Sequence, residues 1–263
     1  MVSVPLDALP LWAVFVVTLV LISLSVEIGQ RLARFQTRRF EGERESSVGS
    51  MAGSTGAMVG AMLGLLAFML AFTFGMAANF FQARREVVLS EANAIGTTYL
   101  RAAMLPESIG TDARNLLREY VDVRVKAAQG INVDQAVSQS EELHGRLWSQ
   151  AVAASEHDRS AVTALFIQSL NEVIDLHAKR VMVALRTRVP PPIWMALYLV
   201  AILSMAAVGY SQGLTSTRRS LAAFALIFTF SVVMLLIVDL DRPGEGLLRV
   251  SQQSVIDLQK SMR

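Results

Sequence analysis

Residues 46–83 read SSVGSMAGSTGAMVGAMLGLLAFMLAFTFGMAANFFQA, a stretch without a charged side chain. About 20 apolar residues suffice for a helix to cross the hydrocarbon core of a bilayer, so the stretch predicts a membrane-spanning helix that continues beyond it. Gly56, Gly60 and Gly64 recur at every fourth position and form a strip of bare backbone that other helices can approach closely. The strip has two interpretations: helix packing within one subunit, or packing between subunits around a central axis.

Three further stretches have the length and composition of a membrane span: residues 8–26, 193–210 and 220–238. Trp12, Trp194 and Tyr198 lie near the starts of two of them, where aromatic side chains anchor helices at the membrane interface. The first stretch lacks the basic start of a secretory signal peptide. The chain is 53% hydrophobic and 17% charged, with a mean hydropathy of +0.44. We therefore predict an all-α integral membrane protein with four transmembrane helices.

The segment between the second and third spans has apolar residues at helical spacing. Pro106, Gly130 and Ser155 mark the junctions between its helices, and the prolines at 190–192 end the last helix at Val189. No breaker follows the second span, which predicts one continuous rod leaving the membrane. The predicted order is a first transmembrane region (1–30), a basic linker (31–55), a second span (56–79), a helical extramembrane domain (80–192), a third span (193–213), a fourth span (219–240) and a tail (241–263). Two transmembrane hairpins thus flank the domain.

The arginines next to the spans give opposite indications for the side of the membrane that holds the domain. Arginines at 31–44 and 218–219 place the short loops inside and both termini outside by the positive-inside rule. Arg84, Arg85, Arg186 and Arg188, at the roots of the domain, oppose that orientation. Arg84 and Arg85 also have two interpretations, because they can bias a pore mouth toward anions or pin the helix to phosphate headgroups.

Composition and motifs exclude several classes of protein. The chain has no cysteine, which excludes disulfides, thiolate catalysis and cysteine metal sites. Its net charge of +2 is too small to indicate nucleic-acid binding. No nucleotide-binding, hydrolase, metalloprotease or kinase signature occurs. We predict a protein that is not an enzyme, with no catalytic residue, cofactor, metal site or nucleic-acid partner.

A second stripe on the long helix contains Phe68, Phe72, Met76 and Phe80. In an oligomer these side chains would form stacked apolar rings, and apolar constrictions gate pores by dewetting. The alternative is that they face lipid or the protein core, as most apolar stripes do.

Polar residues at the ends of the spans are further candidates. Glu27 is either a functional ionisable group or an i,i+4 partner of Arg31. Asp239, Asp241 and Arg242 close the fourth span, where the two carboxylates could gather a hard cation. The alternative there is a structural Asp–Arg clamp.

Four polar residues cluster within two turns of the helical domain: Asn171, Glu172, Asp175 and His177. On a helix Asn171 and Asp175 share a face, whereas His177 points elsewhere. The cluster predicts either acid–base or metal chemistry, or a polar network between helices.

Several strings together resemble the bacterial bestrophin-like membrane family: LAFTFGMA (70–77), QARR (82–85), EANAIGTTYLR (91–101), LREYVD (117–122), LNEVIDLH (170–177), RVPP (188–191), DLDRP (239–243) and VSQQ (250–253). That family is named for a distant likeness to bestrophins, which are pentameric anion channels. The resemblance implies that the second span lines a pore with Phe68, Phe72, Met76 and Phe80. It also implies a cytoplasmic helical domain, and it leaves Asp239, Asp241 and Glu245 as the counterpart of the bestrophin calcium clasp.

Residues and resemblance together predict a homo-oligomeric ion channel or pore in a bacterial inner membrane, pentameric by resemblance alone. Its partners would be the lipid bilayer, further copies of the chain and ions. The alternative is a non-conducting membrane scaffold or sensor, whose helical domain docks a protein partner.

Overall fold

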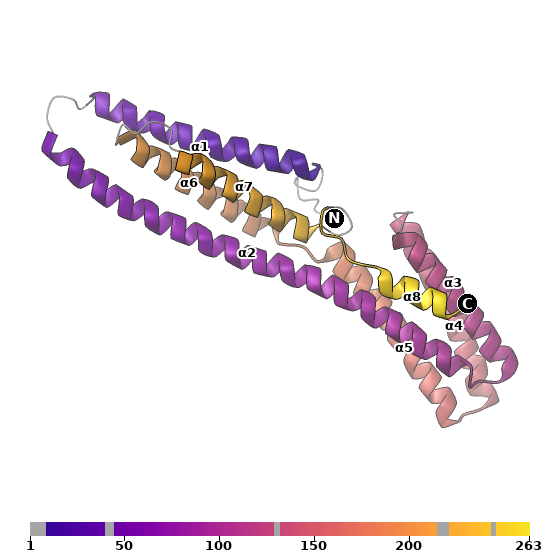
Figure 1. Cartoon of the computed structure of the whole chain (residues 1–263). Coiled ribbons are helices and arrows are strands. Elements are labelled where there is room, and N and C mark those ends of the chain that lie inside the picture. The colour runs from indigo at the N-terminus through magenta and orange to yellow at the C-terminus, as the bar shows by residue number, and fades with distance from the viewer. Residues whose placement is uncertain (1–8, 40–44, 129–131, 215–220, 243–245) are drawn as a thin grey trace. The chain divides into compact units, whose positions relative to one another are not determined.

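The computed structural model describes residues 9–39, 45–128, 132–214, 221–242 and 246–263. Its described residues are helical without strands (Figure 1), in the order α1 (Leu11–Arg39), α2 (Glu45–Ala102), α3 (Glu107–Ala128), α4 (Val133–His157), α5 (Ala161–Val181), the π-helix η2 (Met182–Arg186), α6 (Pro191–Leu214), α7 (Leu221–Asp241) and α8 (Gln253–Ser261). Helices α1, α2, α6 and α7 are long and apolar enough to cross a membrane. The predicted all-α membrane protein with four transmembrane helices is confirmed.

The chain divides into two compact units. The first contains residues 1–80 and 188–248, with α1, the first part of α2, α6 and α7. The second contains residues 81–187 and 249–263, with the remainder of α2, α3 to α5, η2 and α8. Helix α2 is continuous from Glu45 to Ala102, as the absence of a helix breaker predicts.

Helices α1 and α6 pack at backbone contact in the first unit. Gly29 in α1 lies against Ala206, and Gly209 in α6 lies against Val26, so closely that a Cβ at either glycine would overlap a carbonyl oxygen of the other helix. A hydrogen bond of 2.9 Å from Gln30 Nε2 to the Gln212 side-chain oxygen adds a polar contact. Glycine is required at these positions because the two backbones meet there.

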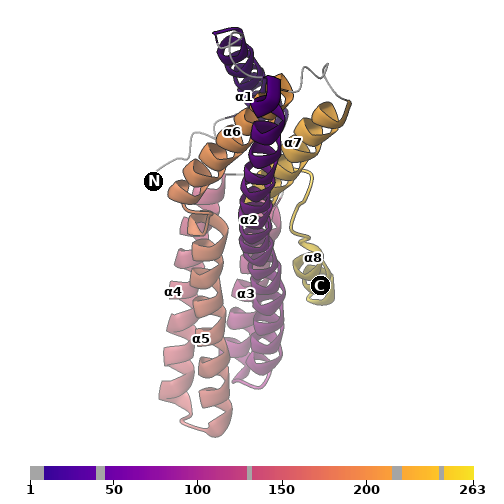
Figure 2. The same cartoon turned by 90° about the vertical axis from the view of Figure 1, so that its left-hand side faces the viewer.

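The second unit is a helical bundle in which α3, α4 and α5 run beside one another (Figure 2). Helices α4 and α5 each begin at a residue whose side chain caps the helix. Asn132 caps α4 by accepting a hydrogen bond from the Gln135 backbone, and Ser160 caps α5 in the same way. The bundle core is formed by apolar side chains of α2 to α5 and α8, the largest fully buried ones being Ile95, Leu117, Tyr120, Leu147, Phe166 and Leu170.

Three helix boundaries differ from the sequence-based ones. Most of the range assigned to a linker, 31–55, is helical, because α1 continues to Arg39 and α2 begins at Glu45. The last domain helix leaves α-helical geometry at Val181 and ends with η2 at Arg186. It stops before Val189 because residues that precede proline favour extended backbone.

The C-terminal tail forms an element of its own. Helix α8 joins the core of the second unit through Val255 and Met262, which are both buried. Arg118 of α3 donates a hydrogen bond of 2.7 Å to the Met262 carbonyl oxygen. The range 241–263 is therefore not a free tail: its last part is a helix packed in the bundle.

Candidate functional site

One face of α2 is covered and another is open. Leu66, Leu70, Thr73 and Ala77 are buried and follow a straight helical stripe. Phe68 lies on the open face with 66% of its surface exposed. The described residues of the first unit therefore leave a mostly apolar side of this transmembrane helix uncovered.

The four candidate gate residues do not share one environment. Phe72 is 55% exposed like Phe68, whereas Met76 and Phe80 are partly buried. Each step of four residues turns a side chain about 40° around a helix of 3.6 residues per turn. The stripe therefore winds from the open face toward the covered one, and Phe68 and Phe72 are the two members on the open face.

The glycine strip lies on the open side of α2. A Cβ added at Gly56, Gly60 or Gly64 would meet no described atom within 4 Å. Close approach of helices within the described chain occurs at Gly29 and Gly209 instead. Among the described residues of the first unit, the strip is therefore not an intramolecular packing surface.

The acidic residues at the end of α7 bind backbone amides. The two Asp239 carboxylate oxygens accept hydrogen bonds from Leu247 N (2.8 Å) and Leu248 N (3.0 Å). Asp241 Oδ1 accepts one from Val189 N at 2.8 Å, and Arg188 donates one to the Asp241 carbonyl oxygen at 2.9 Å. This geometry corresponds to a structural clamp.

The remaining residues of this region fit the same role. Arg242 donates a hydrogen bond of 2.7 Å to the Leu9 carbonyl oxygen. Gly246 has a φ of 140°, and a Cβ there would overlap the Asp239 carboxylate. Glu245 lies outside the described residues. The described residues contain no group of three or more His, Asp and Glu side chains that could hold a metal ion.

Glu27 forms an ion pair with Arg31 at 3.1 Å, one turn along α1. The pair lies at a groove of about 500 Å³ lined by α1 and α7, with Ser23, Phe224 and Ile227 among its walls.

The two candidate arginines at the root of the domain differ in their exposure. Arg84 is buried and donates a hydrogen bond of 3.2 Å to the Thr187 carbonyl oxygen, whereas Arg85 is exposed.

The structure separates the four polar candidates of α5. Asn171, Glu172 and Asp175 are exposed, whereas His177 is buried on the opposite side. His177 instead joins a group of side chains from four helices, which we call the Glu91 cluster: Glu91, Tyr120, Arg124, His144, His177 and Arg180.

Glu91 of α2 is fully buried at the centre of this cluster. Its Oε1 accepts a hydrogen bond of 2.6 Å from the Tyr120 hydroxyl, and Arg124 Nε lies 3.4 Å from the same oxygen. Its Oε2 accepts a hydrogen bond from Arg180, whose second amino group donates to the Gln252 side chain at 2.8 Å. One carboxylate is therefore shared by two buried or nearly buried guanidinium groups.

Two histidines complete the Glu91 cluster. The rings of His144 and His177 meet edge to face, with centroids 4.9 Å apart. Burial lowers the pKa of His144 to about 4, and burial together with the neighbouring Arg124 lowers the pKa of His177 to about 4. Both histidines are therefore neutral at pH 7, whereas burial and Glu91 raise the pKa of Tyr120 well above its ordinary value.

We predict that the domain loses stability as the pH falls from about 6.5 to about 4. In this window the unfolded chain binds protons at both histidines while the folded chain does not, so acid favours unfolding. Each histidine contributes a slope of up to about 1.4 kcal/mol per pH unit. Thermal unfolding between pH 7.5 and 4.5 measures the slope. His144→Phe should reduce it and His157→Gln, at an exposed site, should leave it unchanged; equal slopes in all three proteins would contradict the assignment.

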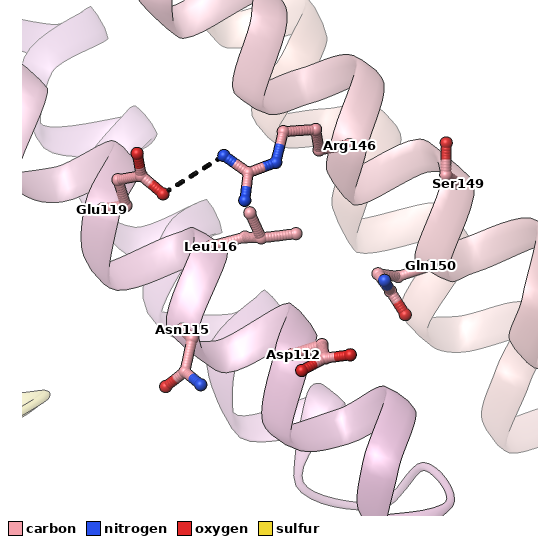
Figure 3. A pocket seen from close by; sticks show the side chains of 7 residues that line it. All are labelled: Asp112, Asn115, Leu116, Glu119, Arg146, Ser149 and Gln150. Atoms are coloured by element: carbon pink, nitrogen blue, oxygen red, sulfur yellow. Dashed lines mark hydrogen bonds and ion pairs between the residues drawn. The ribbon is translucent and has the colours of Figure 1, made fainter.

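A second groove lies on the surface of the bundle between α3 and α4 (Figure 3). Its volume is about 500 Å³, and Asp112, Asn115 and Gln150 line it together with an exposed ion pair of 3.4 Å between Glu119 and Arg146. The groove is polar and open, and it is separate from the Glu91 cluster.

Comparison with known proteins settles the family. A model of the bestrophin-like domain matches residues 9–255, nearly the whole chain. The chain belongs to the bestrophin-like family. A crystal structure whose title describes a membrane protein shares the fold of this bestrophin-like chain, with a TM-score of 0.59 over 92% of this chain and 95% of the other at 13% identity. No curated protein matches this chain.

The family assignment confirms the resemblance read from the sequence strings, one of which, EANAIGTTYLR, begins with Glu91. The sequence did not reveal that Glu91 anchors a buried cluster in this bestrophin-like protein. A signal was present, because Glu91 shares helical spacing with Val88 and Ile95, which are core positions of α2. A charge in such a position requires a buried partner, but the partners lie on other helices.

Proposed function

We propose that this bestrophin-like chain assembles with further copies of itself into an ion channel of a bacterial inner membrane, with α2 beside the central axis. The open face of α2 supports the proposal. Glycine costs a helix about 1 kcal/mol relative to alanine, and contact with lipid alone gives no compensation. Close packing of another helix against the glycines compensates for this cost. In the first unit the described residues leave Gly56, Gly60 and Gly64 uncovered, so a helix of another copy is needed to supply that packing.

Flux through the purified protein tests the proposal. The protein is reconstituted into liposomes, and chloride and potassium flux are measured under matched gradients. Flux above that of protein-free vesicles with an ion preference is the expected result. No flux of either ion from a protein shown to be inserted and oligomeric would reject the channel.

Phe72→Ala should raise the flux of the reconstituted protein several-fold. Phe72 is 55% exposed on the open face of α2, and removal of an apolar ring widens and wets a constriction. Phe224→Ala is a matched control, because Phe224 is 57% exposed on α7. Unchanged flux in a conducting Phe72→Ala protein would count against the gate.

Gly60→Leu should abolish the oligomer without unfolding the subunit. A leucine at this position fits within the described chain but separates α2 from a helix of a neighbouring copy. Size-exclusion chromatography with light scattering measures the mass. Gly145→Leu on the exposed side of α4 is the control, since its Cβ also meets no described atom within 4 Å. A Gly60→Leu protein with the wild-type oligomeric mass would reject the packing role.

A non-conducting scaffold or sensor remains a second candidate because the bundle exposes large apolar side chains. Trp148 and Val152 are exposed one turn apart on α4, Leu100 is exposed in the last turn of α2, and Met104 is exposed just after that helix. Such positions favour docking of a protein. Binding of a partner by a reconstituted protein without flux would favour this function over the channel.

A further inference from the structure

The groove between α1 and α7 lies entirely within the membrane-spanning unit, where these two helices run side by side (Figure 1). Its α1 wall follows one face of that helix, with Val20, Leu24, Glu27 and Arg31 three or four residues apart. Buried apolar side chains form its floor: Val26, Ala223 and Ile227. The groove is therefore apolar along most of its length and ends at the ion pair of Glu27 and Arg31.

This ion pair lies at the depth of lipid headgroups. Trp12 is 71% exposed at the start of α1, where an exposed aromatic side chain marks one membrane interface. The rise from Trp12 to Arg31 along an α-helix is about 28 Å, close to the roughly 30 Å of a hydrocarbon core. The apolar part of the groove therefore faces the acyl chains of one leaflet, and the ion pair faces the headgroups of the same leaflet.

The length and the polarity of the groove indicate what fills it. Its α1 wall extends from Leu19 to Arg31, about 18 Å of helix, against roughly 15 Å for one half of the hydrocarbon core. Without an occupant its walls would lack dispersion contacts, and water would find few polar partners along them. An acyl chain of the adjoining leaflet supplies those contacts, which places the headgroup of the same lipid at the ion pair.

Glu27 and Arg31 present opposite charges side by side to that headgroup. Arg31 donates through Nε to Glu27 Oε1 at 3.1 Å, and its side chain is 75% exposed, so further N–H groups of the guanidinium are available for a phosphate. The Glu27 side chain is 27% exposed, and a carboxylate accepts up to about four hydrogen bonds. A primary ammonium group donates to a carboxylate, whereas a trimethylated one has no N–H. The pair therefore complements a headgroup that carries both a phosphate and a primary ammonium group.

We propose that the groove binds one phospholipid with a phosphoethanolamine headgroup. The phosphate oxygens accept hydrogen bonds from Arg31, and the ammonium group donates to Glu27. One acyl chain lies between α1 and α7, against Val26, Ala223 and Ile227. Lipid binding at this site does not depend on conduction by α2, and the lipid has no part in conduction.

Native mass spectrometry of the full-length protein in detergent tests the site. The probes are dioleoyl phosphatidylethanolamine, phosphatidylcholine and phosphatidylglycerol, each titrated into delipidated protein. We expect one phosphatidylethanolamine per subunit to bind saturably and about tenfold more tightly than either other lipid, because phosphatidylcholine cannot donate to Glu27 and phosphatidylglycerol has no positive charge to pair with it. Two results would overturn the proposal: no saturable binding, as when a second copy of the chain covers the groove, or another of the three lipids bound at least as tightly.

Two substitutions separate the headgroup contacts. Arg31→Gln should weaken the binding of phosphatidylethanolamine and phosphatidylcholine about tenfold alike, since both lose a charge-assisted hydrogen bond to the phosphate. Glu27→Gln should weaken phosphatidylethanolamine alone and so remove its preference over phosphatidylcholine. Arg34→Gln is the matched control, because Arg34 is exposed on α1 outside the residues that line the groove. Unchanged affinity in Arg31→Gln, or an unchanged preference in Glu27→Gln, would contradict the assigned contacts.

A measurement on the wild-type protein locates the lipid without any substitution. Phosphatidylethanolamine with a diazirine in the middle of one acyl chain is photolysed with the protein in liposomes, and the labelled peptides are identified. Labels should concentrate on residues 19–26 and 223–227, and excess unlabelled phosphatidylethanolamine should reduce them. Leu199 and Leu203 on α6 are the internal comparison, because both are at least 50% exposed and lie outside the groove. Equal labelling of α6 and the groove would reject a specific site.

Discussion

Gly209→Leu will strongly destabilise the membrane-spanning unit. A Cβ at position 209 would overlap the carbonyl oxygen of Val26 and lie 2.9 Å from the Val26 Cα. These are backbone atoms of α1, so no side chain can rotate away and the two helices must separate. Overpacking costs up to about 3 kcal/mol even where side chains can adjust. For a chain of this size that corresponds to a fall of roughly 10 °C in the unfolding midpoint.

The measurement is the apparent unfolding temperature of the detergent-solubilised protein, followed by intrinsic fluorescence. Gly60→Leu is the matched control, because the same substitution in α2 meets no described atom of the chain within 4 Å. The control should change the oligomeric mass and leave the fold of the subunit in place. A Gly209→Leu protein with the wild-type unfolding temperature would show that α1 and α6 do not pack at backbone contact.

Glu91→Ala will destabilise the helical bundle by about 3–5 kcal/mol, the usual effect of removing one partner from a buried ion pair. The substitution leaves Arg124 and Arg180 without their shared carboxylate and removes the acceptor of the Tyr120 hydroxyl. It therefore creates two uncompensated charges and an unpaired polar group in one place. Hydrogen–deuterium exchange of α3 and α5 measures the loss, which should appear as faster exchange in both helices.

Glu119→Ala is the control for this experiment. Glu119 pairs with Arg146 at 3.4 Å, but more than half of each side chain is exposed. Exposed ion pairs contribute at most about 1 kcal/mol, so exchange in α3 and α5 should barely change. Equal protection in Glu91→Ala and Glu119→Ala would show that the cluster does not hold the bundle together.

The spans and the domain helices were predictable because their signals are local. An uncharged stretch such as 46–83 must be helical in lipid, since its backbone polar groups have no other partners there. The junction at Pro106 was also predictable, because proline interrupts a helix by its own geometry and lies between the end of α2 at Ala102 and the start of α3 at Glu107. The predicted junction residue Gly130 lies outside the described residues. The end of the last domain helix was predicted too late: η2 ends at Arg186, whereas the prediction placed the end at Val189.

The candidate site residues were only partly predictable. His177 was singled out beside Asn171, Glu172 and Asp175, from which the structure separates it. Its contacts are with Tyr120, 57 residues earlier, and with the ring of His144 on α4. Helical spacing relates residues one or two turns apart and carries no information about which face of a distant helix lies opposite.

The sequence alone determined that this protein is helical, spans a membrane four times and carries a helical domain, because lipid and helical periodicity act on each segment separately. Tertiary structure decided which residues matter within that plan. The repeated glycines at 56, 60 and 64 face no other helix among the described residues, whereas the isolated Gly29 and Gly209 lie at backbone contact. Glu91 likewise became the centre of a charge cluster only when helices from distant parts of the chain met around it. Close helix packing and charge pairing each depend on two helices at once. The sequence of a single helix therefore does not reveal either interaction.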